Sequence, residues 1–135
     1  MKKLVFLLCL LFAFNSCSVE DNQKFHYEIL PVESVEMPSE FELGETYPII
    51  IKYYKPTTCH GFNGFYFEKN LNIRTVAVQT VVFEDNTNCE QNTGELFEET
   101  MYFYVTNNGS YIFKFWQGTN EAGEDIFLDY EIPVN

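Results

Sequence analysis

Apolar and polar residues alternate along most of this chain, from residue 21 to its end, and this period of two restricts the fold more than any other feature. In the segment 46–54, every second residue from Tyr47 to Tyr53 is apolar and falls on one face of an extended chain. No later stretch sustains apolar residues at the spacing of three and four that a helix requires. The alternation therefore predicts an all-β domain. The expected strands cover residues 27–30, with a loose continuation to 37, then 46–54, 62–68, 71–84, 96–105, 111–115 and 126–134.

The segments between these strands carry turn signals. Residues 85–94 form a polar run, and Asn108-Gly109 is a pair that readily adopts the positive φ values of a tight hairpin turn. About seven short strands at regular spacing are typical of an antiparallel β-sandwich of immunoglobulin-like type. A small β-barrel is the alternative. The sequence contains no internal repeat, so residues 26–135 are expected to form one domain.

The N-terminus has the pattern of an export signal. Lys2 and Lys3 precede an apolar run over residues 4–14. Eleven apolar residues are too few for a bilayer core of about 30 Å, which a helix crosses with roughly 20, but they suit the apolar region of a cleaved signal. Residues 1–16 are therefore predicted to be a signal peptide.

The end of this signal resembles the lipobox of bacterial lipoproteins, with Ser16 directly before Cys17. The resemblance implies that Cys17 is acylated and begins the mature chain, with residues 17–25 as a lipidated tether. The acidic pair Glu20-Asp21 resembles the surface-export signal of some Gram-negative lipoproteins, which implies display on the cell surface; a periplasm-facing position is the alternative. An ordinary secretory signal and an uncleaved anchor are alternatives to the lipobox.

The charge balance excludes some partners. Eight Lys and Arg stand against 20 Asp and Glu, which gives a formal net charge of −12. Nucleic acids and anionic membranes bind clustered basic residues, and this chain has too few to form a patch. The expected membrane partner is therefore reached through the lipid, and no nucleic-acid partner is expected. The 46% of apolar residues is far above the content of disordered chains.

Of the four cysteines, two remain for a structural role. Cys9 lies in the apolar run and Cys17 is the candidate lipidation site, which leaves Cys59 and Cys89. In an oxidising envelope compartment, such a pair in a small domain indicates a disulfide. The competing interpretation is a metal site because His60 adjoins Cys59, but the Cys-x-x-Cys and His-x-x-x-His spacings of zinc sites are absent. No metal and no cofactor are expected.

The sequence contains no catalytic signature: a nucleophile elbow, a phosphate-binding glycine loop and a His-Glu-x-x-His motif are all absent. His26 and His60 are the two histidines available as bases near neutral pH. His60, between Cys59 and Gly61, is expected to be an exposed loop residue without a catalytic role. The chain is therefore not expected to be an enzyme.

If the strands alternate up and down, three loops fall at the same end of the sandwich, namely residues 55–61, 85–94 and 117–124. A disulfide between the first two would form a rigid tip beside the third, and loops held on a rigid sandwich are common binding surfaces. The alternative is that the disulfide only compensates for a small core. The residues expected at the tip include Pro56, Thr57, Thr58, His60, Phe62 and Trp116.

This layout resembles the chagasin-type inhibitors of cysteine proteases, small immunoglobulin-like domains that insert three loops into a papain-type cleft. The run Lys55-Pro56-Thr57-Thr58-Cys59 stands where the family has Asn-Pro-Thr-Thr-Gly, and Lys114-Phe115-Trp116 stands where it has Arg-Pro-Trp. The resemblance implies that residues 56–58 act as a wedge with Trp116 beside them, in loops 55–61, 85–94 and 114–124. Lys55, Cys59 and Phe115 depart from the family pattern.

Together these features predict a lipid-anchored module of the outer membrane that binds a ligand or supports structure and has no catalytic activity. In its fold and address it resembles immunoglobulin-like lipoproteins of unknown role. A protein or a glycan is the expected ligand, because exposed aromatic side chains stack on sugars and form interface hot spots. The candidates are Tyr54, Tyr102, Tyr104 and Trp116. Inhibition of papain-type proteases is the alternative function.

Overall fold

The structure is a computed structural model that describes residues 24–85 and 87–135. The predicted signal peptide, Cys17 and most of the predicted tether lie outside the described residues. Within them the chain forms eight strands and no helix, so no helix there is long and apolar enough to cross a bilayer. The strands are β1 (Phe25–Leu30), β2 (Val32–Glu36), β3 (Thr46–Tyr54), β4 (His60–Asn70), β5 (Ile73–Phe83), β6 (Leu96–Tyr104), β7 (Gly109–Thr119) and β8 (Asp125–Val134).

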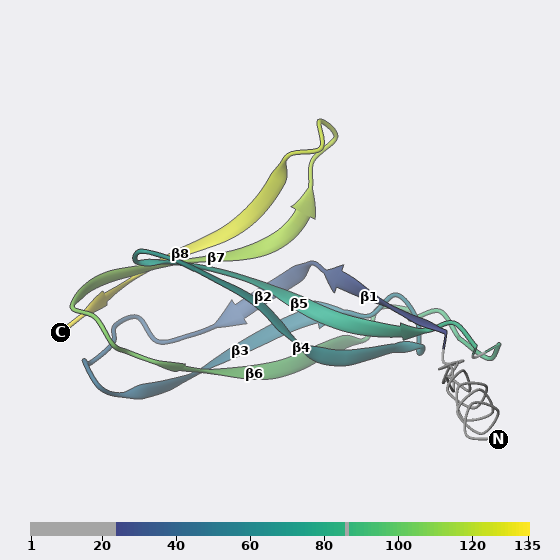
Figure 1. Ribbon diagram of the computed structural model, residues 1–135, viewed down its shortest axis with the longest axis horizontal. Helices are drawn as coiled ribbons and strands as arrows, with labels where there is room; N and C mark the ends of the chain where they lie inside the picture. The colour runs from purple at the N-terminus through teal and green to yellow at the C-terminus, as the bar shows by residue number, and fades with distance from the viewer. Residues whose placement is uncertain (1–23, 86) are drawn as a thin grey trace, which may run out of the picture.

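The strands form two sheets that pack as a sandwich (Figure 1). The larger sheet contains β1, β4, β5, β7 and β8, and the smaller sheet has the order β2-β3-β6. The arrangement is not a closed barrel, so the predicted sandwich is confirmed and the barrel alternative is wrong. Eight strands replace the expected seven because Pro31 divides the first of them. Proline has no N–H for the ladder, and at this residue the chain passes from the larger to the smaller sheet.

The space between the sheets is filled by the apolar face that the alternation predicts. Ile49, Ile51 and Tyr53 of β3 are fully buried, as the period of two requires. The two sheets also meet through aromatic rings: Phe113 of β7 in the larger sheet contacts Phe103 of β6 in the smaller sheet edge to face, with ring centroids 5.0 Å apart. Such pairs add roughly 0.5–1.5 kcal/mol to the stabilisation from burial.

Among the pairings between the eight strands, one is parallel, and it shapes the molecule. β7 runs parallel to β5, but only from Ile112 to Phe115; farther along, β1 occupies that edge of β5. The rest of β7 leaves the sheet together with β8, and this hairpin rises away from the two layers (Figure 1). We call its projecting part, residues 116–127, the arm.

A bulge and a side-chain hydrogen bond mark the place where the arm bends away. The β7–β8 register shifts between Trp116 and Thr119, and Gly118 inside this bulge has a φ of +101°, which glycine adopts without strain. The amide of Gln117 donates a hydrogen bond of 3.1 Å to the carbonyl oxygen of Val32 in β2. The arm is therefore tied to the junction between the two sheets.

Candidate functional site

The Cys59–Cys89 disulfide is present and joins two loops, as the sequence predicts. We call this region, residues 55–60 and 88–95, the loop end. Backbone hydrogen bonds reinforce the disulfide: Thr58 N–H donates to the Glu90 carbonyl over 2.9 Å, and Asn92 N–H donates to the Pro56 carbonyl over 3.0 Å. The two loops are thus paired through their backbones along the stretch that adjoins the disulfide.

His60 is buried at the loop end, so the prediction of an exposed loop residue is wrong. The loop ends two residues earlier than expected: His60 is the first residue of β4, pairs with Val82 of β5 and is 7% exposed. Its Nε2 lies 2.9 Å from a carboxylate oxygen of Glu28, and its Nδ1 lies 2.9 Å from the hydroxyl oxygen of Thr57. Because an ionised carboxylate only accepts hydrogen bonds, Nε2 donates to Glu28; in the neutral imidazole, Nδ1 then accepts from Thr57.

A hydroxyl, an imidazole and a carboxylate in a row are the parts of a nucleophile relay, so their surroundings matter. The Thr57 hydroxyl also accepts the N–H of Cys59 over 3.2 Å. Four backbone amides of the loop end could stabilise an oxyanion if they were free, but each donates to an acceptor within the protein. The row therefore fastens the loop to β1. The four amides belong to Thr58, His60, Glu90 and Asn92.

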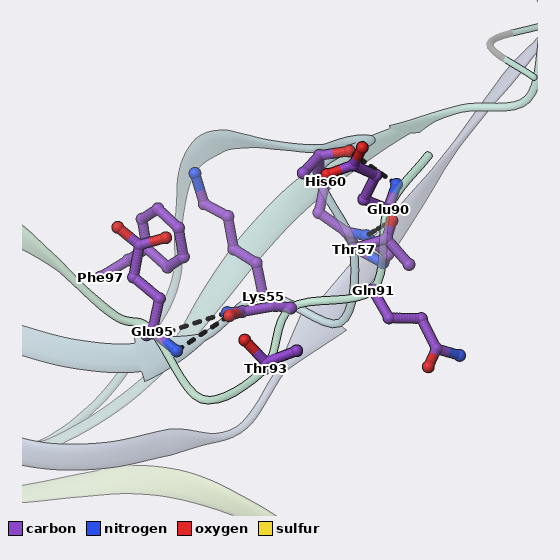
Figure 2. A pocket seen from close by; sticks show the side chains of 10 residues that line it. Lys55, Thr57, His60, Glu90, Gln91, Thr93, Glu95 and Phe97 are labelled. Carbon is purple, nitrogen blue, oxygen red and sulfur yellow. Dashed lines mark hydrogen bonds between the residues drawn. The ribbon is translucent and has the colours of Figure 1, made fainter. Parts of the chain in front are cut away.

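A cavity of about 370 Å³ lies at the loop end (Figure 2). Its polar groups largely satisfy one another: Asn92 bonds the backbone of Glu95 in both directions, and the Thr58 hydroxyl accepts the N–H of Glu90. The ammonium of Lys55 lies 4.3 Å from the ring centroid of Phe97, so Lys55 and Phe97 also interact with each other, as a cation with an aromatic ring. The lining residues are Lys55, Thr57, Thr58, His60, Glu90, Gln91, Asn92, Thr93, Glu95 and Phe97.

Trp116 does not line this cavity. Strand β7 leaves β5 after Phe115, so the arm lies away from the loop end. The prediction that three loops meet at one end is therefore wrong: two of them form the loop end, and the third lies in the arm. Trp116 instead lines a second cavity, of about 430 Å³, between the arm and the outer face of the larger sheet. We call it the arm cleft. Its lining residues are Ile29, Tyr66, Glu68, Thr75, Ala77, Trp116, Asp125 and Phe127.

Two pairs of an aromatic and an acidic side chain organise the arm cleft. The indole N–H of Trp116 donates to Oδ1 of Asp125 over 2.8 Å. The hydroxyl of Tyr66 donates to Oε2 of Glu68 over 3.0 Å, and this hydrogen bond raises the pKa of Tyr66. Each pair fixes the orientation of a ring and of a carboxylate. Among the described residues, the second oxygen of neither carboxylate has a hydrogen-bond partner.

Sequence reasoning named Trp116 but missed the other polar and aromatic members of the cleft. The signal for one pair was local, since Tyr66 and Glu68 are two residues apart and share a strand face. The partners of Trp116 depend on the register of β7 with β8, which places Phe127 opposite Trp116. Among the other expected aromatics, Tyr54, Tyr102 and Tyr104 are exposed.

Comparison with known proteins gives no relative: no family model, no curated protein and no solved structure matches this chain. Within the part of the chain that the structure describes, no group of three or more His, Cys, Asp or Glu residues is placed to hold a metal ion.

Proposed function

We propose that this protein is a lipid-anchored module of the bacterial outer membrane, displayed on the cell surface, that works by binding and not by catalysis. The observation that carries the proposal is the arm cleft. At about 430 Å³ it falls in the range of small-ligand sites, and it combines aromatic rings with fixed polar groups, as such sites do. At the loop end, by contrast, the one relay of catalytic type has its hydroxyl and its neighbouring amides engaged within the protein.

The point at which the chain enters the domain supports this choice of surface. Lys24, just before β1, accepts a backbone hydrogen bond of 2.9 Å from Glu84 and donates one of 3.2 Å to the carboxylate of Asp85. Asp85 begins the segment that leads to Cys89, so an anchor at Cys17 would hold this side of the domain near the membrane. Seven residue steps from Cys17 to Lys24 reach at most about 25 Å. The arm cleft, on the outer face of the sheet, would stay open to a ligand.

Anchoring is tested by labelling cells with radioactive palmitate and separating membranes from soluble protein. We expect label on the wild-type chain and none on Cys17→Ala, which should leave the membrane fraction, because acyl chains supply most of the membrane affinity. Cys9→Ala is the matched control, since it also removes a cysteine near the N-terminus and should keep the label. Equal labelling and retention of the Cys17→Ala chain would contradict the proposal.

Surface display is tested by adding proteinase to intact cells. Loss of the domain from intact cells is the expected result. Digestion only after the outer membrane is opened would instead place the module in the periplasm, and the search for ligands would move there. The binding role itself is tested through the arm cleft, as follows.

A further inference from the structure

The hydrogen-bonding capacity of the arm cleft is weighted toward acceptors, with the hydroxyl of Thr75 as the lining group that can both donate and accept. The N–H of Trp116 and the O–H of Tyr66 are both donated to carboxylates of the cleft itself. The second oxygens of Asp125 and Glu68 are left over, and an ionised carboxylate only accepts. The cleft therefore suits a ligand that brings positive charge or hydrogen-bond donors to these oxygens. A sugar is a poorer match, because its ring and hydroxyl oxygens also need donors.

The aromatic lining adds a second preference. The faces of aromatic rings attract cations, most strongly where water is partly excluded. The protein already uses Phe127 in this way: the ammonium of Lys114 lies 4.8 Å from the centroid of its ring while it bonds the carboxylate of Asp129 over 3.2 Å. A ring together with a carboxylate thus holds a cation at the border of the cleft. Trp116 with Asp125, inside the cleft, offers the same combination to a ligand.

The charge of the surroundings acts in the same direction. Two carboxylates and no basic side chain line the cleft. The whole chain carries a formal net charge of −12, which raises the local concentration of cations and repels anions. The nearby Lys114 does not offset the cleft carboxylates, because Asp129 pairs with it.

We propose that the arm cleft binds small organic cations, that is, an alkylammonium or guanidinium group on a short apolar stem. The charged group lies between Asp125 and Glu68 and against the ring of Trp116, and the stem contacts Ile29 and Ala77. This inference rests on the proposed binding function and names the chemical class of its ligand. The cation could be a free amine or the side chain of a basic residue, and the two share this chemistry.

The test uses the intrinsic fluorescence of Trp116, which is the one tryptophan in the sequence and so reports on this cleft. The full-length chain as isolated, in a neutral polyoxyethylene detergent, is titrated with choline and with 3,3-dimethyl-1-butanol, a neutral molecule of the same shape. We expect a saturable change with choline and binding at least about tenfold weaker for the neutral molecule. The apparent Kd for choline should rise as salt is increased. A parallel titration with Nα-acetyl-lysine methylamide and agmatine tells a side-chain source from a free amine.

Two conservative variants test the residues. Asp125→Asn and Glu68→Gln keep an oxygen that can accept from Trp116 or Tyr66, but each removes a charge. Each should weaken choline binding roughly tenfold, and the double variant should abolish it. Glu98→Gln is the matched control: Glu98 is an exposed carboxylate on β6 of the other sheet and should leave the titration unchanged. Circular dichroism confirms that each variant is folded.

Three results would overturn the inference. Equal binding of choline and its neutral isostere would show an apolar cleft without charge selection. In a further titration with maltose, a saturable response together with none to choline would assign the cleft to sugars, which refutes the cation but leaves the proposed binding function intact. If the Trp116 emission of the folded chain responds to none of the first four compounds titrated, the cleft does not bind cations. The labelling experiments would still decide the anchoring.

Discussion

The loop end and the arm cleft contain cavities of similar size but use their polar groups in opposite ways. At the loop end, His60 has a partner at each ring nitrogen and the neighbouring amides bond other parts of the same loops. In the arm cleft, each carboxylate holds one ring with one oxygen and leaves the other oxygen without a partner among the described residues. Polar groups that satisfy each other stabilise a fold, whereas acceptors left over next to aromatic rings are available to a ligand. The four predictions below separate the two roles.

The largest effect is expected from removing the disulfide. The Cys59→Ser, Cys89→Ser double variant loses a cross-link that closes a loop of about 30 residues, which should lower the free energy of unfolding by about 3 kcal/mol. Urea unfolding monitored by circular dichroism measures this loss, and treating the wild-type chain with reductant should reproduce it. The choline titration of Trp116 should shift less than twofold, because the disulfide does not border the arm cleft. A large loss of choline binding in the folded variant would show that the two regions are coupled.

Removing the buried imidazole should have the next largest effect. His60→Ala leaves Glu28 and Thr57 without their shared partner and opens a small cavity, so the free energy of unfolding should fall by about 2 kcal/mol. His26→Ala is the matched control. His26 also bonds a carboxylate, that of Glu84, but its side chain is 52% exposed, and exposed pairs contribute little. Equal losses in the two variants would contradict a structural role for His60 that depends on its burial.

The two regions also differ in how much of their structure could be predicted from the sequence. Local alternation was sufficient for the sandwich and for the buried face of β3, because the side-chain period of an extended chain is fixed. The disulfide followed from elimination, since Cys59 and Cys89 were the cysteines left after the N-terminal signal was assigned. In both cases the evidence lay within a short stretch of chain or in a count of residue types.

The arm cleft could not be found in this way. It exists because residues 73–76 of β5 pair in parallel with residues 112–115 of β7, and because β1 occupies the edge beyond them. No local pattern records which edge a strand will meet, so the arm was expected to join the loop end. The polar stretch after Trp116 was interpreted as a loop, although its bulge at Gly118 continues β7 to Thr119. His60 was misplaced for a similar reason, because a histidine followed by glycine suggests a turn and its partner Glu28 lies 32 residues away.

A smaller effect is expected from loosening the arm. Gln117→Ala removes the hydrogen bond to the Val32 carbonyl and should lower the free energy of unfolding by about 1 kcal/mol. The stronger consequence should be at the cleft: Trp116 emission should shift to the red, and choline should bind several-fold more weakly, because the cleft walls are less fixed. Gln79→Ala, on the outer face of β5, is the control. If the emission of Trp116 stays unchanged in Gln117→Ala, this contact does not position the arm.

The smallest effect, and one of opposite sign, concerns a buried polar atom that neither bonds another group in the part of the chain that the structure describes nor faces the arm cleft. The hydroxyl of Tyr53 is buried below the loop end, next to Phe97, and has no hydrogen-bond partner among the described residues. Tyr53→Phe removes this unsatisfied group without changing the ring, so it should leave the free energy of unfolding unchanged or raise it by up to about 1 kcal/mol. Burial, together with the nearby Glu99 carboxylate, raises the pKa of Tyr53 to about 12, from about 10 in the unfolded chain.

The sign of the pH dependence follows from that shift. Below pH 10 the hydroxyl is neutral in both states and contributes no slope; between pH 10 and 12 the unfolded chain loses its proton first, so the wild type loses stability there. Tyr53→Phe should lose less stability over the same interval, which urea unfolding at pH 9 and pH 11 measures. Tyr102→Phe, at an exposed residue, should follow the wild type. A parallel decline of Tyr53→Phe and the wild type would mean that the Tyr53 hydroxyl has a partner or solvent access, and the loop end would then be less closed than its hydrogen bonds indicate.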